Sequence, residues 1–498
     1  MSVLGELEPK KVFYYFEQIA SIPHGSGDTK RISDYIILFA ERRGLRYHQD
    51  SKNNVIIWKS ASDGAENAPA VILQGHMDMV CEKEDWCDID FESDGLSLKL
   101  DNGIISAEGT TLGGDDGIAV AYMLALLDSD ELVHPPLECV FTVDEEIGLL
   151  GAASLDVSLL KGRYMINLDS EDEGHIMAGC AGGTTITAHI PYENEVCDNS
   201  SRYLMKVSVS GLLGGHSGQE IDKGRANADS LLGRILYTLK KADPSLRLVS
   251  LKGGSKDNAI PRNSSAFMYI SDKAAVANAI KNLRQAVKTE YRTTDPDIII
   301  NNDYIDIDGS MISSKVMTSD STERVISALF TFPTGLQSMS FEIPGLPETS
   351  LNLGILETRD GEICLSYMIR SSLNSKKSEL SDKLKSLTNA YGGITTVQSD
   401  FSAWEYNPDS ELRDIMINTY RKMFDKEPVI EVIHAAVECG LFTGRLPGLD
   451  AVSIGPDMKD IHTPNEALDA SSVKRTWEYV LEVLKQLADN SQSNLHAE

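Results

Sequence analysis

Hydrophobic and polar positions follow a helical period near the start of the chain and elsewhere gather into short apolar runs. Residues 9–21 and 29–44 carry apolar side chains at helical spacing, and residues 117–130 predict a buried helix. Short apolar runs, typical of strands that are buried on both faces of a parallel sheet, lie at residues 54–59, 70–78, 137–146 and 163–169. Strands that alternate with helices predict an α/β fold with a mostly parallel sheet and helices on both of its faces.

The pattern changes near residue 190. Residues 226–243 predict a helix, and polar and apolar side chains alternate, as in half-buried strands, within residues 202–212, 265–271, 295–314 and 348–372. The α/β pattern returns after about residue 399. A chain of 498 residues is too long for a single hydrophobic core. We therefore predict one α/β domain made of residues 1–190 and 399–498, with an α+β domain inserted at residues 191–398.

Composition narrows the classes of function. The 46 Lys and Arg against 75 Asp and Glu give a formal charge of −29, which argues against nucleic acid and against an anionic membrane surface as partners. No apolar run reaches the length of a membrane span, and the first residues lack the pattern of a signal peptide. The seven cysteines form no Cys-x-x-Cys pair, so we expect reduced thiols, a cytoplasmic location, and any metal on His and carboxylate groups.

Acidic residues and one histidine follow several of the predicted strands. His76 and Asp78 are two residues apart and face the same way on a strand, so Asp78 is placed to accept a hydrogen bond from the ring of His76. Acidic residues also stand before the buried helix and after two further strands, and they are Asp115, Asp116, Asp144, Glu145, Glu146 and Asp169. Each segment alone is more often a satisfied structural pair or a solvated helix start.

Together these segments favour a metal site. The carboxyl ends of strands in an α/β sheet meet at one edge, where such proteins place their ligands. Several carboxylates crowded at that edge are costly unless cations lie among them. Two divalent metals with one bridging carboxylate would remove the cost. His462, far downstream, is a further candidate ligand.

The order of these motifs resembles the zinc metallopeptidase family of aminoacylase, carnosinase and bacterial carboxypeptidase G. The segments that carry the resemblance are HMDMV at 76–80, GTTLGGDDGIAVA at 109–121, DEEIGLLGA at 144–152, NLDSEDEG at 167–174 and IHTPNE at 461–466. Gly114 and Asp116 stand where Ala and Asn are common in this family, and neither change removes a ligand. The resemblance implies a zinc-exopeptidase catalytic domain with an inserted lid domain, and a homodimer formed through the lid.

The resemblance also implies two zinc ions per chain, for which Mn²⁺ or Co²⁺ could substitute. His76 and Asp169 would bind one ion and Glu146 and His462 the other, with Asp115 as the bridge. Glu145 would be the general base and Asp78 the partner of His76. A non-proline cis peptide is expected after the bridging aspartate.

Four further residues are expected to contact the substrate, and they are His216, Asn258, Arg370 and Glu438. By the resemblance His216 stabilises an oxyanion and Arg370 grips a substrate carboxylate. The alternatives are a surface histidine in a Gly-rich turn for His216, a surface ion pair for Arg370, and a positioning or helix-capping role for Glu438. His434 is expected to be structural.

The function implied is metal-dependent hydrolysis of unblocked dipeptides, including those that end in histidine. A tripeptide aminopeptidase and an N-acyl amino acid deacylase of the same family would use the same metals. They would differ in how the lid domain binds the two ends of the substrate. A relative that binds peptides without catalysis is a further alternative, but Glu145 and all of the implied ligands are present.

Overall fold

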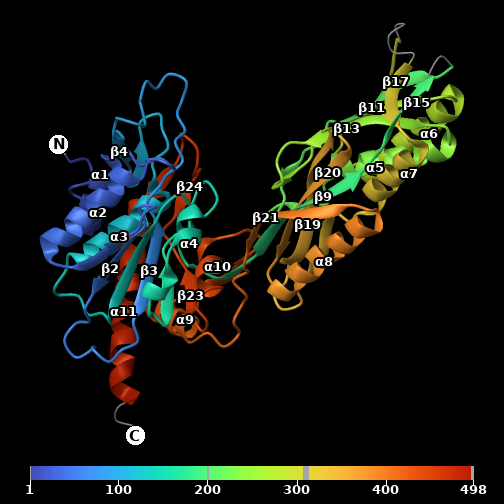
Figure 1. The fold of residues 1–498 in the computed structure, drawn as a ribbon. Coiled ribbons are helices and arrows are strands. Elements are labelled where there is room, and N and C mark those ends of the chain that lie inside the picture. The colour runs from blue at the N-terminus through green and yellow to red at the C-terminus, as the bar shows by residue number, and fades with distance from the viewer. Residues whose placement is uncertain (1, 199–200, 307–312, 495–498) are drawn as a thin grey trace. The chain divides into compact units, whose positions relative to one another are not determined.

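The computed structural model describes residues 2–198, 201–306 and 313–494, and the chain forms two compact units (Figure 1). Unit 1 contains residues 1–179, 406–432 and 437–498, and unit 2 contains residues 180–405 and 433–436. Among the described residues, no helix has both the length and the apolar character needed to cross a membrane.

Unit 1 is built on an eight-stranded sheet. Its strands, in spatial order, are β1 (Arg46–Gln49), β2 (Val55–Lys59), β6 (Leu137–Thr142), β3 (Val71–His76), β7 (Tyr164–Asn167), β23 (Asp450–Ser453), β8 (His175–Cys180) and β22 (Val429–Ile433). The central strands β6, β3, β7 and β23 are parallel to one another, while β1, β2 and β8 pair antiparallel with their neighbours. The predicted α/β class is confirmed, but the sheet is mixed, since only its centre is parallel.

The helices of unit 1 bury the hydrophobic faces of this sheet. They are α1 (Lys10–Ala20), α2 (Lys30–Arg43), α3 (Gly114–Leu127), α4 (Leu150–Ser154), α9 (Glu411–Phe424), α10 (Glu438–Thr443) and α11 (Ala470–Asn494). Helix α3 is apolar on nearly every side because it packs between β3, α1 and α11, where Tyr122 donates a hydrogen bond to the Val473 carbonyl at 2.8 Å. A small sheet of β24 (Met458–Lys459), β25 (Ala467–Asp469), β5 (Ile104–Ala107) and β4 (Leu98–Asp101) completes the unit.

Unit 2 is built on a nine-stranded sheet that has helices on one face (Figure 1). The strands, in spatial order, are β16 (Ile299–Ile305), β11 (Tyr203–Ser210), β15 (Ser264–Ile270), β13 (Arg247–Gly254), β19 (Pro347–Arg359), β20 (Glu362–Ser371), β9 (Gly182–Pro191) and β21 (Ile394–Phe401), and β18 (Gly335–Met339) pairs with β19. The helices are α5 (Ala228–Ala242), α6 (Lys273–Glu290), α7 (Ser319–Thr331) and α8 (Asn374–Ala390). Ile363, Leu365 and Ile369 of β20 belong to the apolar core between these helices and the sheet.

Two short pairs of strands complete unit 2: β10 (Asn194–Asp198) with β17 (Ser313–Met317), and β12 (Gly215–His216) with β14 (Ala259–Ile260). The strand structure expected within 295–314 includes β16, while residues 307–312 of that segment lie outside the described residues.

The limits of the units differ from the domain limits expected from the sequence. Residues 180–190 and 399–405 were assigned to the α/β domain but lie in unit 2. The physical reason is strand pairing, because β9 lies between β20 and β21 in the second sheet. The four-residue segment 433–436 also belongs to unit 2, although the chain on both sides of it is in unit 1.

Strand β3 and helix α3 approach each other closely at Gly75. A Cβ at this position would lie 2.4 Å from Asp116 Oδ2 and 2.6 Å from the Cβ of Ala119. Both distances are shorter than van der Waals contact, so a side chain at residue 75 requires the helix to move. This contact fixes how near the start of α3 lies to the carboxyl end of β3.

We expect Gly75→Ala to lower the free energy of unfolding by about 1–3 kcal/mol, the usual cost of overpacking a core. Gly117→Ala is the matched control, because its added Cβ would lie 3.4 Å from the nearest atom of Phe16 and alanine favours a helix. Denaturant unfolding of the two variants measures the difference. Equal stability of both variants would show that the contact at Gly75 does not constrain the packing.

Candidate functional site

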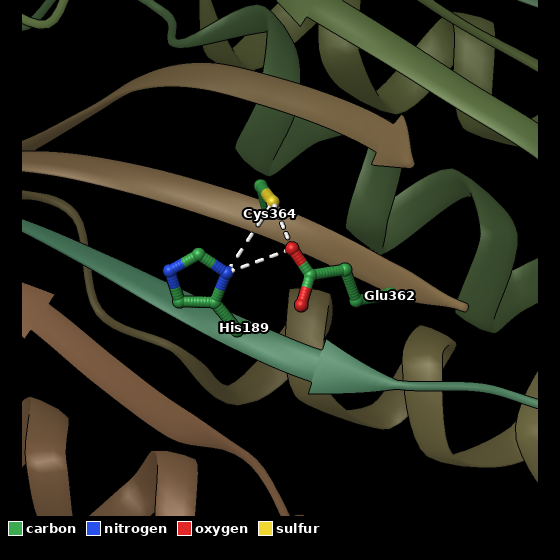
Figure 2. A group of neighbouring side chains, drawn as sticks. All are labelled: His189, Glu362 and Cys364. Atoms are coloured by element: carbon green, nitrogen blue, oxygen red, sulfur yellow. Dashed lines mark hydrogen bonds and ion pairs between the residues drawn. The ribbon is translucent and has the colours of Figure 1, made fainter. Parts of the chain in front are cut away.

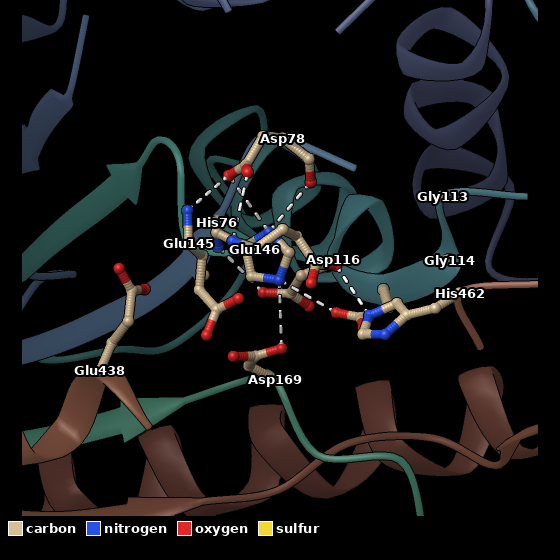
Figure 3. A network of polar contacts seen from close by, with 12 residues as sticks. His76, Asp78, Gly113, Gly114, Asp116, Glu145, Glu146, Asp169, Glu438 and His462 are labelled. Carbon is tan, nitrogen blue, oxygen red and sulfur yellow. Dashed lines mark hydrogen bonds and ion pairs between the residues drawn. The ribbon is translucent and has the colours of Figure 1, made fainter. Parts of the chain in front are cut away.

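The candidate ligands of unit 1 lie where the parallel strands end (Figure 3). His76 is the last residue of β3, Glu145 and Glu146 follow β6, and Asp169 comes two residues after β7. Because these strands are parallel neighbours, their carboxyl ends bring the four side chains to one edge of the sheet. Asp144, between β6 and these glutamates, accepts a hydrogen bond from the Gly27 main-chain nitrogen at 2.7 Å instead.

Asp115 lies between two histidines at the start of α3. Its Oδ1 is 3.0 Å from Nε2 of His76, and its Oδ2 is 3.1 Å from Nε2 of His462. The peptide bond that joins Asp115 to Asp116 is cis, as expected from the sequence. His462 reaches the cluster from the segment between β24 and β25, in a left-handed backbone conformation with a φ of 61°.

Each histidine also meets a second carboxylate. Nε2 of His76 is 3.4 Å from Oδ1 of Asp169, and Nε2 of His462 is 2.9 Å from Oε1 of Glu146. The structure therefore brings the five expected metal ligands together in two groups that share Asp115. Asp116 also lies here, and its Oδ2 accepts a hydrogen bond from the His76 main-chain nitrogen at 3.0 Å.

Burial of so many carboxylates perturbs their protonation. Burial raises the pKa of Asp169 to about 7 and that of Glu145 to about 9, and neighbouring carboxylates add to both shifts. Hydrogen bonds to Asp115 and Glu146 raise the pKa of His462 to about 10. Burial opposes ionisation of Asp115, but the hydrogen bonds from His462 and His76 outweigh it and lower the pKa of Asp115. The histidines therefore supply the positive charge that balances this cluster.

The donors present suit divalent cations. Imidazole nitrogen and carboxylate oxygen are the donors that zinc binds in catalytic sites, and they also suit Mn²⁺ and Co²⁺. Among the described residues, no Lys or Arg forms an ion pair with Asp115, Glu146 or Asp169. Asp116 Oδ1 is buried and has no hydrogen-bond partner within the described chain. Cations at this edge would balance the ionised carboxylates, so the residues fit a metal centre.

Asp78 meets His76, but in a way that the sequence did not predict. Nδ1 of His76 is 3.0 Å from the main-chain oxygen of Asp78 and 3.5 Å from its Oδ1, so the main-chain oxygen is the nearer acceptor. The carboxylate of Asp78 accepts hydrogen bonds from Ser26 Oγ at 2.8 Å and from the Glu145 main-chain nitrogen at 3.1 Å. Strand β3 ends at His76, so the strand alternation that predicted the contact does not extend to Asp78.

Glu466 is a positioning residue that the sequence analysis did not identify. Its buried carboxylate accepts hydrogen bonds from the main-chain nitrogens of Leu112 and Gly114, both at 2.8 Å, and of Gly113 and Asp115. It thereby fixes the turn that presents Asp115. In the sequence, the position of Glu466 four residues after His462, within the IHTPNE segment, could have identified it.

Glu438, which was expected to contact the substrate, is fully buried in unit 1. Its carboxylate accepts hydrogen bonds from Thr142 Oγ1 at 2.7 Å and from the Gln74 amide. Burial raises the pKa of Glu438 to about 7. These contacts favour a positioning role beneath the end of β6 over a direct contact with substrate.

The other three expected substrate residues lie in unit 2. His216 and Asn258 come together because β12 pairs with β14, and the main-chain oxygen of Asn258 accepts a hydrogen bond from Ser217 at 2.9 Å. Nδ1 of His216 accepts the main-chain N–H of Gln219 at 3.1 Å, so the neutral ring carries its proton on Nε2. Burial and the nearby Arg370 lower the pKa of His216, which favours this neutral form.

Arg370 is a buried cation. Its Nη2 is 3.5 Å from Nε2 of His216, its Nε has no hydrogen-bond partner, and it forms no ion pair with any residue that the structure describes. Burial lowers the pKa of Arg370 to about 10, and the side chain still remains charged at neutral pH. The surface ion pair considered for Arg370 is therefore absent from the described contacts, and a buried guanidinium without an ion-pair partner suits an anionic ligand. Nearby, Nε2 of His434 forms a hydrogen bond with Ser350 Oγ at 2.7 Å and the ring is buried, in keeping with a structural role.

Two known proteins match this chain along nearly its full length. A relative described as the cytosol non-specific dipeptidase of Escherichia coli strain K12 is 35% identical over 489 residues, which cover 98% of this chain and 99% of the relative. The crystal structure of aminoacylhistidine dipeptidase from Vibrio alginolyticus matches with a TM-score of 0.88 and 34% identity over 97% of this chain and 98% of that one.

A third match shares the fold alone. The aminopeptidase PepT from Bacillus cereus superposes with a TM-score of 0.55 at 15% identity, over 97% of this chain and all of the other (100%). The model of the peptidase family M20/M25/M40 matches residues 72–486. Because this match spans most of the chain and the E. coli relative aligns along nearly its full length, the chain belongs to the peptidase family M20/M25/M40.

Proposed function

We propose that this chain hydrolyses the peptide bond of unblocked dipeptides, including those that end in histidine, in a metal-dependent reaction. The observation that carries the proposal is the Asp115 carboxylate, whose two oxygens face His76 and His462 in separate ligand groups. The E. coli and Vibrio relatives, both of which bear dipeptidase names, support the choice of substrate.

The residues that would hold the metal fall into two sets. His76 and Asp169 would bind one zinc ion, and Glu146 and His462 would bind the other. Asp115 would bind both ions. Mn²⁺ or Co²⁺ could replace zinc. When bound, such a pair supplies Lewis acidity to the peptide carbonyl and lowers the pKa of a water molecule.

Glu145 is the group that would move the proton. Its carboxylate lies in the same ligand cluster as His76 and Glu146, and it is partly buried. Burial and the neighbouring carboxylates hold its pKa above that of a free glutamate, and cations bound among these carboxylates would favour the ionised form that accepts a proton. Glu145 would accept a proton from the attacking water and deliver it to the amine that leaves.

Unit 2 would bind the ends of the substrate. The Nε2 proton of neutral His216 is suited to donate a hydrogen bond to the oxyanion that forms at the peptide carbonyl. The guanidinium of Arg370 would pair with the free carboxylate of the dipeptide, and Asn258, which is exposed, would add a polar contact. Recognition of the free carboxylate would confine the enzyme to short peptides.

Location, assembly and specificity complete the proposal. The E. coli relative is described as a cytosol enzyme, which supports a cytoplasmic location. We expect a homodimer formed through unit 2, which would then act both as lid and as dimerisation domain. A tripeptide aminopeptidase and an N-acyl amino acid deacylase remain the same-family alternatives.

A substrate panel separates these activities. We expect the purified protein to cleave Ala-His with a higher kcat/KM than Ala-Ala-Ala or N-acetyl amino acids, because the two relatives that match along nearly the full chain bear dipeptidase names. Release of free amino acids measures the three rates under the same metal supply. A rate on Ala-His no higher than on the other two would reject the dipeptidase assignment, and binding without turnover would favour the non-catalytic alternative.

Removal of the general base separates catalysis from metal binding. We expect Glu145→Ala to lower kcat by about 10²–10⁴-fold, the usual contribution of a general base, with metal content unchanged. The exposed Glu131 provides the control, since Glu131→Ala removes a carboxylate that is not part of the ligand cluster. Kinetics and elemental analysis of both variants provide the test, and near-normal turnover by Glu145→Ala would remove this residue from its assigned role.

Replacing the free carboxylate of the substrate by an amide tests the role of Arg370. We expect Arg370→Ala to lower kcat/KM for Ala-His by roughly 10- to 100-fold, as a hydrogen bond to a charged group predicts, while cleavage of the carboxyl-terminal amide of Ala-His changes little. Arg234→Ala, which removes a half-exposed arginine paired with Glu290 in the same unit, is the control. Equal losses of kcat/KM for Ala-His and for its carboxyl-terminal amide would show that Arg370 supports the fold and does not bind the substrate carboxylate.

A further inference from the structure

Three side chains that commonly bind metals meet on the sheet of unit 2, and none of them belongs to the cluster around Asp115. They are His189 on β9 and Glu362 and Cys364 on β20 (Figure 2). His189 and Cys364 are opposite each other across the antiparallel pair, and Glu362 precedes Cys364 by two residues, so all three point to the same face. Their neighbours Ile363 and Leu365 point to the other face, into the apolar core.

The distances between the three donor atoms fit one tetrahedral ion. Nδ1 of His189 is 2.9 Å from Oε1 of Glu362, Sγ of Cys364 is 3.6 Å from that Nδ1, and the same Sγ is 3.3 Å from Oε1. Zinc bonds of about 2.0–2.3 Å at tetrahedral angles place such donors about 3.3–3.6 Å apart. The histidine and glutamate atoms need to separate by only a few tenths of an ångström to admit an ion.

The ring of His189 is already oriented for this role. Its far nitrogen, Nε2, is 2.9 Å from Oγ1 of Thr396 on β21. A donor hydrogen bond from Nε2 to Thr396 leaves the lone pair on Nδ1, which is the atom that faces Cys364 and Glu362. Histidines that bind metals commonly donate their other ring N–H to a fixed acceptor in this way.

Burial and charge also suit a cation. Cys364 is 2% exposed, whereas the side chains of His189 and Glu362 retain 15% and 34% exposure, so an ion can enter from solvent and keep a solvent molecule as its fourth partner. A thiolate and a carboxylate together neutralise one divalent ion, which avoids an unbalanced charge in a half-buried place.

We propose that His189, Glu362 and Cys364 bind a divalent cation of the zinc class at a site separate from the cluster around Asp115. On binding, the thiol of Cys364 loses its proton to solvent and its sulfur becomes the third protein donor, and any proton on Nδ1 of His189 leaves in the same way. The ion would join β9 to β20, and the His189 hydrogen bond to Thr396 would extend this link to β21. One soft sulfur and one imidazole favour zinc over Mg²⁺ or Ca²⁺.

Cobalt is a direct probe, because Co²⁺ bonded to thiolate gives a near-ultraviolet charge-transfer absorption that carboxylate and imidazole ligands do not give. The five expected ligands around Asp115 include no cysteine, so this band reports on a site outside that cluster. The full-length protein, stripped of metal by a chelator, is titrated with Co²⁺ and then with Zn²⁺. We expect the band to appear with Co²⁺, to vanish as Zn²⁺ displaces it, and to account for one cation per chain.

Matched variants assign the band. We expect Cys364→Ser to abolish it and His189→Gln to weaken Co²⁺ binding at least tenfold, whereas Cys81→Ser and Cys87→Ser retain it. Circular dichroism and thermal unfolding establish that each variant is folded. Asp115→Ala should keep the band even if hydrolysis is lost, so the two sites are tested independently.

Either of two results would overturn the proposal. The first is the absence of the band in folded wild-type protein that binds Co²⁺ elsewhere, which would make the three residues a hydrogen-bonded cluster. The second is a band that survives in Cys364→Ser.

Discussion

The structure of unit 1 depends on how it stabilises several buried carboxylates at the edge of one sheet. Asp115, Glu146 and Asp169 converge there because parallel strands end together, and two histidines share the oxygens of Asp115. Their mutual repulsion and burial favour protonated carboxyl groups, whereas divalent cations favour the ionised groups. The same constraint explains why Glu466, itself buried, uses its carboxylate to fix the main chain that precedes Asp115.

Much of the architecture that serves this edge could be predicted from residue patterns. The apolar runs before His76, Glu145 and Asp169 identified three neighbouring parallel strands, and the apolar residues 117–130 identified the buried helix. The limits of the two units were less accessible, because β9 joins the second sheet through pairing with strands far away in the sequence. The local pattern of polar and apolar residues does not indicate which distant strands will pair.

For side-chain roles too, some features followed from the sequence and others depended on tertiary contacts. Sequence order placed His76 near Asp78, but the end of β3 at His76 makes the Asp78 main-chain oxygen the closer acceptor. Glu438 is a candidate for substrate contact in the sequence, whereas in the structure its carboxylate accepts hydrogen bonds from Thr142 and Gln74. The absence of a Cys-x-x-Cys pair argued against cysteine as a metal ligand, yet strand pairing brings Cys364 opposite His189. In each case the deciding contact comes from tertiary packing.

The two units carry different charged side chains. Unit 1 gathers negative charge and contains Glu145, the proposed general base, and unit 2 contains His216 and a buried Arg370 that forms no ion pair among the described residues. The central claim is that two divalent cations share Asp115, and metal content tests it most directly. In a Cys364→Ser background, which removes the site proposed on unit 2, elemental analysis should find two cations per chain in active protein, as a co-catalytic pair requires, and fewer when Asp115→Ala is added. Two cations retained after Asp115→Ala is added in that background, or full hydrolysis by wild-type protein stripped of metal, would contradict the claim.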